Sequence, residues 1–313
     1  MMLLSICIPT KNRPVLLEKT LQSFFDEPVD KALYEVVISD NSDDDANLNV
    51  VNKFKSMGLQ CVYYRNPEQG FYNSIKALVL GNGDFLKLNN DYTKFKSGSL
   101  QKMIDLVSAN IERKPQMFFT DGNVKSKKIN YFSDFDTFLG ETSYWNTWST
   151  GFSIWRSDLD LLDTSRAALD ENFPHVSLLF ANKNKSDYCV DDRIHFINQP
   201  VSSKGGYNIF KLFCVDYVDM LRELIDGGSL TEKTYKKILR NLRDKFIPQW
   251  LQASVYTKNG LTFNNDDYIS NIKLNFSGKD FLIIKIRAYV YVIIWHVKQL
   301  VKKCFAMCIK KTH

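Results

Sequence analysis

Several signatures of common protein classes are missing from this sequence of 313 residues. Its cysteines form no CxxC pair, and no histidine stands at metal-ligand spacing from any of them, which argues against a zinc site. We expect free thiols in a reducing cytosol for Cys7, Cys61, Cys189, Cys214, Cys304 and Cys308. No GxGxxG follows the first apolar run, and the segment PTKNRPVLL contains no glycine, which argues against nicotinamide enzymes and sugar nucleotidyltransferases.

Long apolar segments are missing as well. The N-terminus, MMLLSICIPTK, has no extended apolar region or cleavage-like site, so we expect a short strand there and not a signal peptide. Near the C-terminus the longest uncharged run, residues 288–297, is about half of what spans a bilayer. The net charge is +6, and the basic residues gather near the C-terminus. This distribution favours an anionic membrane or a phosphorylated substrate over a nucleic acid.

Strand and helix patterns alternate along the first part of the chain. Apolar runs predict strands at 3–8, 34–40, 60–65 and 84–91, and helical spacing predicts helices at 14–25, 46–57, 71–80 and 98–112. A fifth strand with a turn is expected at 117–123, a helix at 173–182, and a helical, basic region beyond 206. This alternation implies an α/β fold with a Rossmann-like, mostly parallel sheet and flanking helices.

Polar, turn-rich clusters follow each of the first four predicted strands. They are Pro9–Arg13, Asp40–Asp43, Arg65–Asn66 and Asn89–Asp91. Ligands of open parallel sheets bind at the carboxyl ends of the strands. The four clusters therefore predict a binding crevice at that edge.

Two of these clusters carry groups with a specific chemistry. The carboxylate of Asp40 could accept hydrogen bonds from a nucleotide base or ribose, or it could cap the next helix. The oxygens of Asn89, Asn90 and Asp91 suit a hard divalent cation, which would neutralise a departing diphosphate. The same three residues could instead form an Asx turn.

The second half of the chain offers a sugar-contacting segment and a base. In WSTGFSIWRSDL, 148–159, a glycine among aromatic and hydroxyl side chains would let a sugar approach the backbone, unless the aromatics are core. His175 follows Pro174 at a predicted helix start in a chain with four histidines. A neutral imidazole can deprotonate a hydroxyl nucleophile, although most lone histidines are structural.

These motifs together resemble the family-2 glycosyltransferases of the A-type fold. SICIPTKNRPVLLEKTLQSF is similar to the opening strand and loop of that family, and ISDNSDDD to its "VxDNxSxD". YYRNPEQGFYNSIKAL resembles its third strand and next helix, and GNGDFLKLNND its "GxYxxxLxDDD". More loosely, WSTGFSIWR and FPH resemble the branch of abequosyltransferase-like O-antigen enzymes, and the resemblance ends near residue 205.

The resemblance implies an inverting transferase that uses a nucleotide diphosphate sugar with Mg²⁺ or Mn²⁺. By position, the donor would be bound by Pro9, Thr10, Arg13, Asp40, Arg65, Asn66, Asn73, Asn89 and Asn90. Asp91 would be the metal ligand, although two of the family's three carboxylates are amides here. The family's Glu-Asp pair aligns with Pro174-His175, so we expect His175 to be the base, with Asp170 and Glu171 as alternates.

The patterns divide the chain into three parts. We expect a nucleotide-sugar-binding half at 1–97, an acceptor-binding half of the same catalytic domain at 98–205, and a C-terminal helical region at 206–313. The apolar, lysine-interrupted segment 278–311 would lie on anionic lipid, or would pack on the catalytic domain or a second subunit.

The predicted enzyme is a hexosyl- or deoxyhexosyltransferase. Its acceptor would be a lipid-linked oligosaccharide of a bacterial surface glycan, such as O-antigen lipopolysaccharide or capsule. It would be cytoplasmic and peripheral on the inner face of the cell membrane, with a homo-oligomer allowed and no nucleic-acid partner. The alternative is a degenerate, non-catalytic module that binds a nucleotide or sugar.

Overall fold

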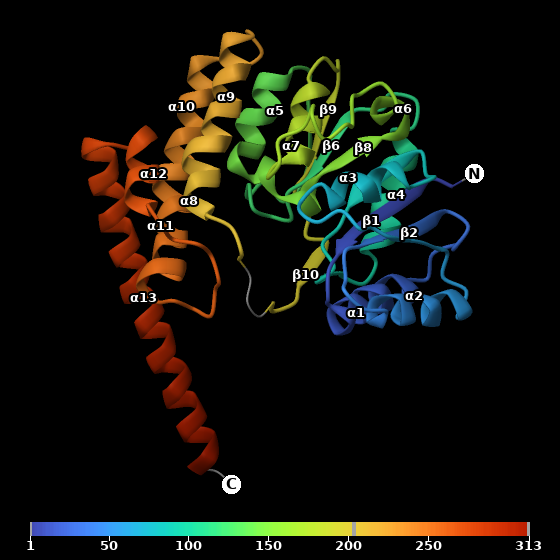
Figure 1. Ribbon diagram of the computed structural model, residues 1–313, viewed down its shortest axis with the longest axis horizontal. Coiled ribbons are helices and arrows are strands. Elements are labelled where there is room, and N and C mark those ends of the chain that lie inside the picture. The colour runs from blue at the N-terminus through green and yellow to red at the C-terminus, as the bar shows by residue number, and fades with distance from the viewer. Residues whose placement is uncertain (1, 202–204, 312–313) are drawn as a thin grey trace. The chain divides into compact units, whose positions relative to one another are not determined.

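The computed structural model describes residues 2–201 and 205–311, without the side chains of 303–311, and the chain forms two compact units (Figure 1). The first unit is Met1–Pro200 and the second is Val201–His313. The expected boundary at 205/206 stays a prediction. The expected division at 97/98 falls inside the first unit and stays a prediction.

A five-stranded sheet forms the centre of the first unit. Its order is β3-β2-β1-β4-β8, with β1 at Leu4–Thr10, β2 at Tyr34–Asp40, β3 at Cys61–Arg65, β4 at Phe85–Leu88 and β8 at Ser153–Trp155. The first four strands are parallel, and β8 runs antiparallel to β4. The register places Thr10 beside Asp40 and Asp40 beside Arg65. The polar clusters that follow these strands therefore meet at one edge.

Helices cover both faces of this sheet, as a parallel sheet requires. The helices are α1 (Pro14–Phe25), α2 (Ala46–Ser56), α3 (Asn73–Val79) and α4 (Ser99–Ala109). On one face, Ile6 and Ile38 of the sheet share a buried core with Leu21 of α1, Phe54 of α2 and Met103 of α4. Helix α3 packs against β1 and β2.

Two smaller sheets complete the first unit. One has the order β6-β9-β7, with β6 at Gln116–Phe119, β7 at Ile129–Phe132 and β9 at Tyr188–Asp191. The other pairs β5 (Thr93–Phe95) with β10 (Phe196–Asn198). The remaining helices are α5 (Phe135–Thr142), the 3₁₀ turns η1 (Ser143–Thr147) and η2 (Ser149–Gly151), α6 (Arg156–Leu159) and α7 (Pro174–Ala181).

Most predicted elements are present. The helix at 14–25 and the strand at 34–40 have the predicted bounds, whereas the strand predicted at 84–91 ends at Leu88. Asn89 and Asn90 follow that strand without regular structure and Asp91 begins a turn, and the side chains of Asn89 and Asp91 bond local backbone and a neighbouring loop. Phe152 and Trp155 are fully buried, which confirms the core alternative for these two aromatics.

The second unit is helical, as expected. It contains α8 (Ile209–Lys211), α9 (Tyr217–Asp226), α10 (Glu232–Asn241), α11 (Ile247–Trp250), α12 (Tyr268–Asn275) and α13 (Gly278–Lys311). Three π-helical segments continue these helices: η3 (Leu212–Asp216), η4 (Leu242–Phe246) and η5 (Leu251–Tyr256). Within the described ranges, no helix combines the length and apolar character needed to cross a bilayer.

The cysteines behave as expected where their side chains are described. Cys7, Cys61, Cys189 and Cys214 are unpaired. Burial raises the pKa of the Cys61 and Cys189 thiols to about 12, so both are unreactive thiols at neutral pH. Cys304 and Cys308 lie outside the described side chains.

Candidate active site

A nearly buried carboxylate stands at the centre of the sheet edge. Asp91, three residues beyond β4, is 2% exposed. Its Oδ2 accepts a hydrogen bond from Thr10 Oγ1 at 2.8 Å, and its Oδ1 lies 3.1 Å from Nη1 of Arg13. Burial raises the pKa of Asp91, and the charge of Arg13 opposes this shift. Three predicted site residues, from the end of β1, the start of α1 and the end of β4, are thereby in contact.

Asn73 joins the ends of the other strands from the first residue of α3. Its Nδ2 donates to the carbonyl of Ser39 at 2.9 Å and reaches the carbonyl of Thr10 at 3.4 Å. Its Oδ1 accepts from Asn66 Nδ2 at 3.0 Å. Pro9 pairs with Ser39 in the register of β1 and β2. The predicted residues Asn66 and Asn73 thus belong to one hydrogen-bond network at the sheet edge, and Pro9 lies beside Ser39 of that network.

Asp40 is fully buried and its carboxylate is surrounded by donors. Oδ1 accepts from the backbone N and Oγ of Ser42, at 2.9 and 2.5 Å, and from Asn47 Nδ2 at 3.0 Å. Oδ2 accepts from the Tyr63 hydroxyl at 2.8 Å. Burial, together with the bond to Asp40, raises the pKa of Tyr63 to about 12. A nucleotide base that donated to Oδ2 of Asp40 would therefore have to share that oxygen with Tyr63.

Basic side chains gather on the loops around this edge. Arg65 donates to the carbonyl of Ser42 at 2.8 Å and pairs with Asp45 at 2.6 Å. Lys11 donates to the side chain of Gln69 at 2.7 Å, and Arg166 to the Gln69 carbonyl at 3.1 Å. Guanidinium groups match the oxygens of phosphates. With Arg13, these cations suit a diphosphate.

The Ser149–Gly151 turn holds Asn90 from the other side. The backbone N of Asn90 donates to Thr150 Oγ1 at 3.2 Å, and the side-chain Oδ1 of Asn90 accepts from Ser149 Oγ at 2.9 Å. Asn89 donates to the carbonyls of Asn90 and Thr93 at 2.9 and 2.8 Å. Its Oδ1 is buried and has no hydrogen-bond partner among the described residues.

The described residues of this edge offer few ligands for a cation. Across the described ranges, no three His, Cys, Asp or Glu side chains stand close enough together to hold a metal ion. Asp91 offers one carboxylate, which already accepts a hydrogen bond from Thr10 and pairs with Arg13. Asn89 offers a side-chain oxygen without a hydrogen-bond partner among the described residues. Mg²⁺ commonly uses one or two carboxylates with substrate phosphates and water. The residues therefore fit a cation that takes most of its ligands from a bound diphosphate.

His175, the second residue of α7, contacts the last residue of η1. It is 6% exposed, and its Nε2 lies 3.0 Å from the carbonyl of Thr147, so Nε2 carries the proton and Nδ1 is the basic nitrogen. Burial lowers the pKa of His175 to about 4. Of the two alternates, Asp170 accepts from the backbone N of Asn172 and Phe173 at 2.8 and 2.7 Å, and Glu171 is exposed.

Sequence reasoning missed several residues of this edge. One is Tyr63, which lies on the same face of β3 as the predicted Arg65, and this period-two spacing is a signal that the sequence does carry. Lys87 stands inside the apolar strand FLKL, another visible signal. Ser149 and Thr150 lie in the predicted segment 148–159, but their contacts with Asn90 are tertiary and no local pattern indicates them. The same is true of the contact of Arg166 with Gln69.

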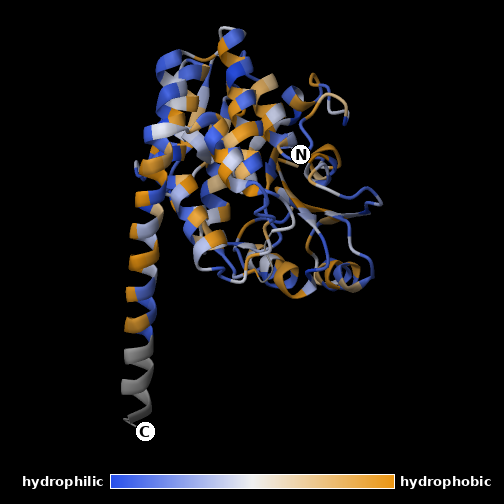
Figure 2. Ribbon diagram, turned by 60° about the vertical axis from the view of Figure 1, so that its left-hand side comes forward, coloured by the Kyte–Doolittle hydropathy of each residue, from blue (hydrophilic) through white to orange (hydrophobic). Residues whose placement is uncertain are grey.

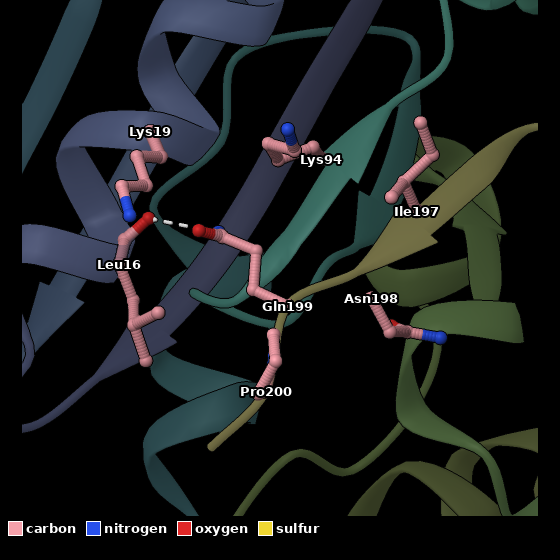
Figure 3. A pocket seen from close by; sticks show the side chains of 7 residues that line it. All are labelled: Leu16, Lys19, Lys94, Ile197, Asn198, Gln199 and Pro200. Carbon is pink, nitrogen blue, oxygen red and sulfur yellow. Dashed lines mark hydrogen bonds between the residues drawn. The ribbon is translucent and has the colours of Figure 1, made fainter. Parts of the chain in front are cut away.

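A separate pocket of about 570 Å³ lies beside α1 (Figure 3). Its lining consists of Leu16, Lys19, Lys94, Ile197, Asn198, Gln199 and Pro200. None of the predicted site residues lines it. Its wall nevertheless touches the back of the site, because Gln199 donates to Thr20 Oγ1 at 3.1 Å, and Thr20 donates to the carbonyl of Asp91 at 2.8 Å.

Comparisons with known proteins agree with this geometry. Residues 5–112 match the family model of glycosyl transferase family 2. That segment contains Asp91 and every residue predicted to bind the donor. A search of curated proteins finds no significant match to the chain.

Solved structures share the fold. Residues 1–349 of TarS from S. aureus superpose with a TM-score of 0.60 at 15% identity, over 93% of this chain and 89% of that chain. The same fragment in complex with UDP-GlcNAc gives 0.57 at 15% identity and the same coverage. The mannosyltransferase PcManGT from Pyrobaculum calidifontis, in complex with GDP-Man and Mn²⁺, gives 0.52 at 14% identity, over 96% and 87%. The expected A-type glycosyltransferase fold is confirmed.

The low pKa of His175 predicts a specific pH dependence of stability. Between pH 6.5 and about 4 the unfolded imidazole binds a proton that the folded one does not, so the free energy of unfolding must fall as the pH falls through this window. The variant His175→Gln lacks this proton uptake. Urea unfolding at pH 7, 5.5 and 4.5 should show the wild type losing stability relative to the variant. A constant difference across the three pH values would contradict the burial of a neutral imidazole.

Proposed function

We propose that this protein is an inverting glycosyltransferase that moves a sugar from a nucleotide diphosphate sugar to a hydroxyl group. The observation that carries the proposal is the contact of Asp91 with Thr10 and Arg13 at the carboxyl edge of the parallel sheet. A buried carboxylate with a paired arginine, beside loops rich in basic side chains, suits a diphosphate and a counter-ion. The match of residues 5–112 to glycosyl transferase family 2 supports the same function.

The proposed reaction uses groups from both sides of the edge. The acceptor hydroxyl attacks the anomeric carbon from the face opposite the diphosphate, the bond to the diphosphate oxygen breaks, and the configuration inverts. The hydroxyl proton passes to Nδ1 of His175, with Asp170 and Glu171 as the alternate bases. Arg13 and Arg65 offset the charge that develops on the leaving diphosphate.

A divalent cation would complete this charge balance. Asp91 would be its protein ligand, and the donor's diphosphate would supply further oxygens. When bound, Mg²⁺ or Mn²⁺ neutralises charge on the departing diphosphate. Because the protein offers few ligands, the cation would bind with the donor and only weakly to the free protein.

Donor hydrolysis by the purified protein tests the function. With UDP-, GDP-, CDP- and dTDP-sugars in turn, one donor should be hydrolysed slowly with Mn²⁺ or Mg²⁺, and EDTA should stop the turnover. Asp91→Asn should reduce the rate by about a hundredfold or more, because the leaving charge loses its stabilisation. Turnover that survives EDTA would remove the metal from the proposal. No turnover and no nucleotide binding in calorimetry would refute the transferase.

The base is tested by substitution in the same assay with an acceptor present. His175→Ala should lower the rate of transfer by about a hundredfold or more, the usual contribution of a positioned base. Because burial lowers the pKa of His175 to about 4, the acidic fall in kcat/KM should come near pH 4 and not near 6.5. A His175→Ala enzyme with near wild-type turnover would transfer the role to Asp170 or Glu171.

One observation favours a second candidate. Asn89 and Asn90 stand where the family pattern has carboxylates. The carboxylate of Asp40 accepts four hydrogen bonds, from Ser42, Asn47 and Tyr63. A degenerate module that binds a nucleotide or sugar without turnover has the same features. Nucleotide binding without hydrolysis of any donor would support it.

The finer identity rests on the resemblance of the sequence. We propose a hexosyl- or deoxyhexosyltransferase of the abequosyltransferase-like branch, acting on a lipid-linked oligosaccharide in the synthesis of O-antigen lipopolysaccharide or a related surface polysaccharide. The site of action would be the inner face of a bacterial membrane. The C-terminal helix α13 provides the physical support for this location.

Helix α13 has an exposed apolar stripe (Figure 2). Leu282, Ile293 and Leu300 are 57%, 63% and 62% exposed. The whole stripe is Leu282, Ile286, Tyr289, Val290, Ile293, Ile294, Val297, Leu300 and Val301. At 100° per residue these side chains cover about 140° of the helix surface over about 28 Å. Ile284 and Ala288 are buried on the opposite face, so the stripe is not the face that packs within the unit.

Charge decides which partner suits this stripe. Arg287 and Lys298 lie beyond one edge of it and Lys285 beyond the other, at helical spacing. The sequence from 281 to 311 contains no acidic residue. A second copy laid along the stripe would therefore bring like charges together on both flanks. An anionic bilayer surface satisfies the apolar stripe and its basic flanks at once.

Vesicle binding tests the membrane contact independently of catalysis. The wild type should sediment with vesicles containing phosphatidylglycerol and much less with pure phosphatidylcholine. Ile286→Asp with Ile293→Asp should weaken this binding at least about tenfold, because two apolar side chains no longer enter the bilayer. Leu161→Asp, at a position 86% exposed in the first unit, is the matched control and should bind like the wild type.

Two outcomes would contradict the membrane contact. The first is equal sedimentation of the wild type and the double variant. The second is a dimer in solution, measured by light scattering, that the double variant converts to a monomer. Donor hydrolysis should be unchanged in the double variant, so this test does not depend on the transferase assay.

A further inference from the structure

A lysine is buried in the centre of the main sheet. Lys87, in β4, is fully buried beneath the strand end that carries Asn89 to Asp91. Its Nζ donates to the carbonyl of Leu88 at 2.7 Å and to the carbonyl of Thr150. The same atom lies 5.2 and 4.9 Å from the ring centres of Phe119 and Phe196. The ammonium group is thus enclosed by two carbonyls and two aromatic faces.

Burial of this group is costly. Desolvation lowers the pKa of Lys87 to about 7, with the nearby Cys7 and Asp121 opposing the shift. A methionine at this position would fill a similar volume without a charge, and replacing buried ions by apolar groups is often neutral or stabilising. Fold stability alone therefore does not account for a lysine at this position.

The contact with Thr150 connects Lys87 to the candidate active site. Thr150 belongs to the turn Ser149–Gly151, whose two hydroxyls bond the amide and the side chain of Asn90. Strand β8, which continues from this turn, pairs with β4, with Ser153 opposite Lys87. Lys87 is thus one of the groups that connect the Ser149–Gly151 turn to β4.

Gly151 shows how closely this turn is packed. A Cβ atom at Gly151 would lie 2.2 Å from the ring of Phe118 and 2.7 Å from the carbonyl of Phe119. The turn therefore has little freedom to move toward β6. On its other side it is attached to β4 by Lys87 and Asn90. Its position relative to Asn90 depends on both contacts.

We propose that Lys87 is a positioning residue that fixes the Ser149–Gly151 turn, and through it Asn90, in the geometry needed for departure of the donor's diphosphate. This inference rests on the proposed transferase function. Lys87 itself contacts no substrate in the proposal, because it is enclosed within the protein. It acts by donating to the Thr150 carbonyl while the Thr150 and Ser149 hydroxyls bond Asn90.

Hydrogen exchange of the full chain tests the positioning without a substrate. In Lys87→Met, the amides of residues 146–153 should exchange at least about tenfold faster, since the turn loses a bond to a charged donor. The peptide covering 34–40 should not change. Leu86→Met is the matched control, because Leu86 is also fully buried in β4, opposite Ile154, and the swap conserves volume. Equal exchange in all three proteins would overturn the proposal.

Steady-state hydrolysis of the preferred donor tests the consequence for catalysis. Lys87→Met should lower kcat by about tenfold or more with KM changed less than about twofold, because most of the predicted donor-binding residues follow β1 to β3 and do not contact the Ser149–Gly151 turn. Leu86→Met should retain both constants. Unchanged kcat in Lys87→Met despite faster exchange would also overturn the proposal.

A second variant covers the case in which Lys87→Met does not fold. Thr150→Val removes the hydroxyl that accepts from the Asn90 amide and leaves the carbonyl bonded to Lys87. It should lower kcat in the same way while the exchange of 146–153 changes less than in Lys87→Met. Wild-type kcat in Thr150→Val would overturn the link to Asn90. If the wild type hydrolyses no donor, the proposed function fails, and hydrogen exchange alone decides whether Lys87 positions the turn.

Discussion

The pairing of Asp91 with Thr10 and Arg13 is the interaction on which the candidate site depends. A carboxylate that is 2% exposed needs partners, because an unpaired buried charge is strongly destabilising. Its partners come from the end of β1 and the entry to α1, and Thr20 of α1 binds its backbone carbonyl. The segment that follows β4 is therefore held in place by the first strand and helix, and the Ser149–Gly151 turn bonds Asn90 beside it.

This arrangement also sets the charge of the site. Asp91 stands where the family pattern that the sequence resembles has the last of three carboxylates, and Lys11, Arg13, Arg65 and Arg166 all reach the loops of the same edge. Each of these arginines is paired with a carboxylate, Arg13 with Asp91, Arg65 with Asp45 and Arg166 with Glu68, so a bound diphosphate would compete for cations that are already in place. A protein of this kind would neutralise much of a diphosphate's charge with its own side chains, and a divalent ion would enter together with that diphosphate.

The sequence predicts local features well and tertiary contacts poorly. The fully buried run at 34–40 and the one-sided helix at 14–25 have their predicted bounds because burial and periodicity act within each segment. The strands β5 and β10 have three residues each, too few for a period to be recognised. Thr150 and Asn90 are 60 residues apart and meet through the antiparallel pairing of β4 with β8, which no local pattern indicates. The low pKa of His175 likewise depends on the burial of its side chain, which the sequence alone does not predict.

The weak basicity of His175 is compatible with the base that we propose. Desolvation lowers its pKa to about 4 in the protein without a donor. A diphosphate bound near the imidazole in the proposed reaction would add negative charge, and negative charge near an imidazole raises its pKa. In an inverting displacement the acceptor hydroxyl also becomes more acidic as it bonds to the anomeric carbon. In the proposed reaction, proton transfer to Nδ1 would therefore become more favourable once donor and acceptor are both bound.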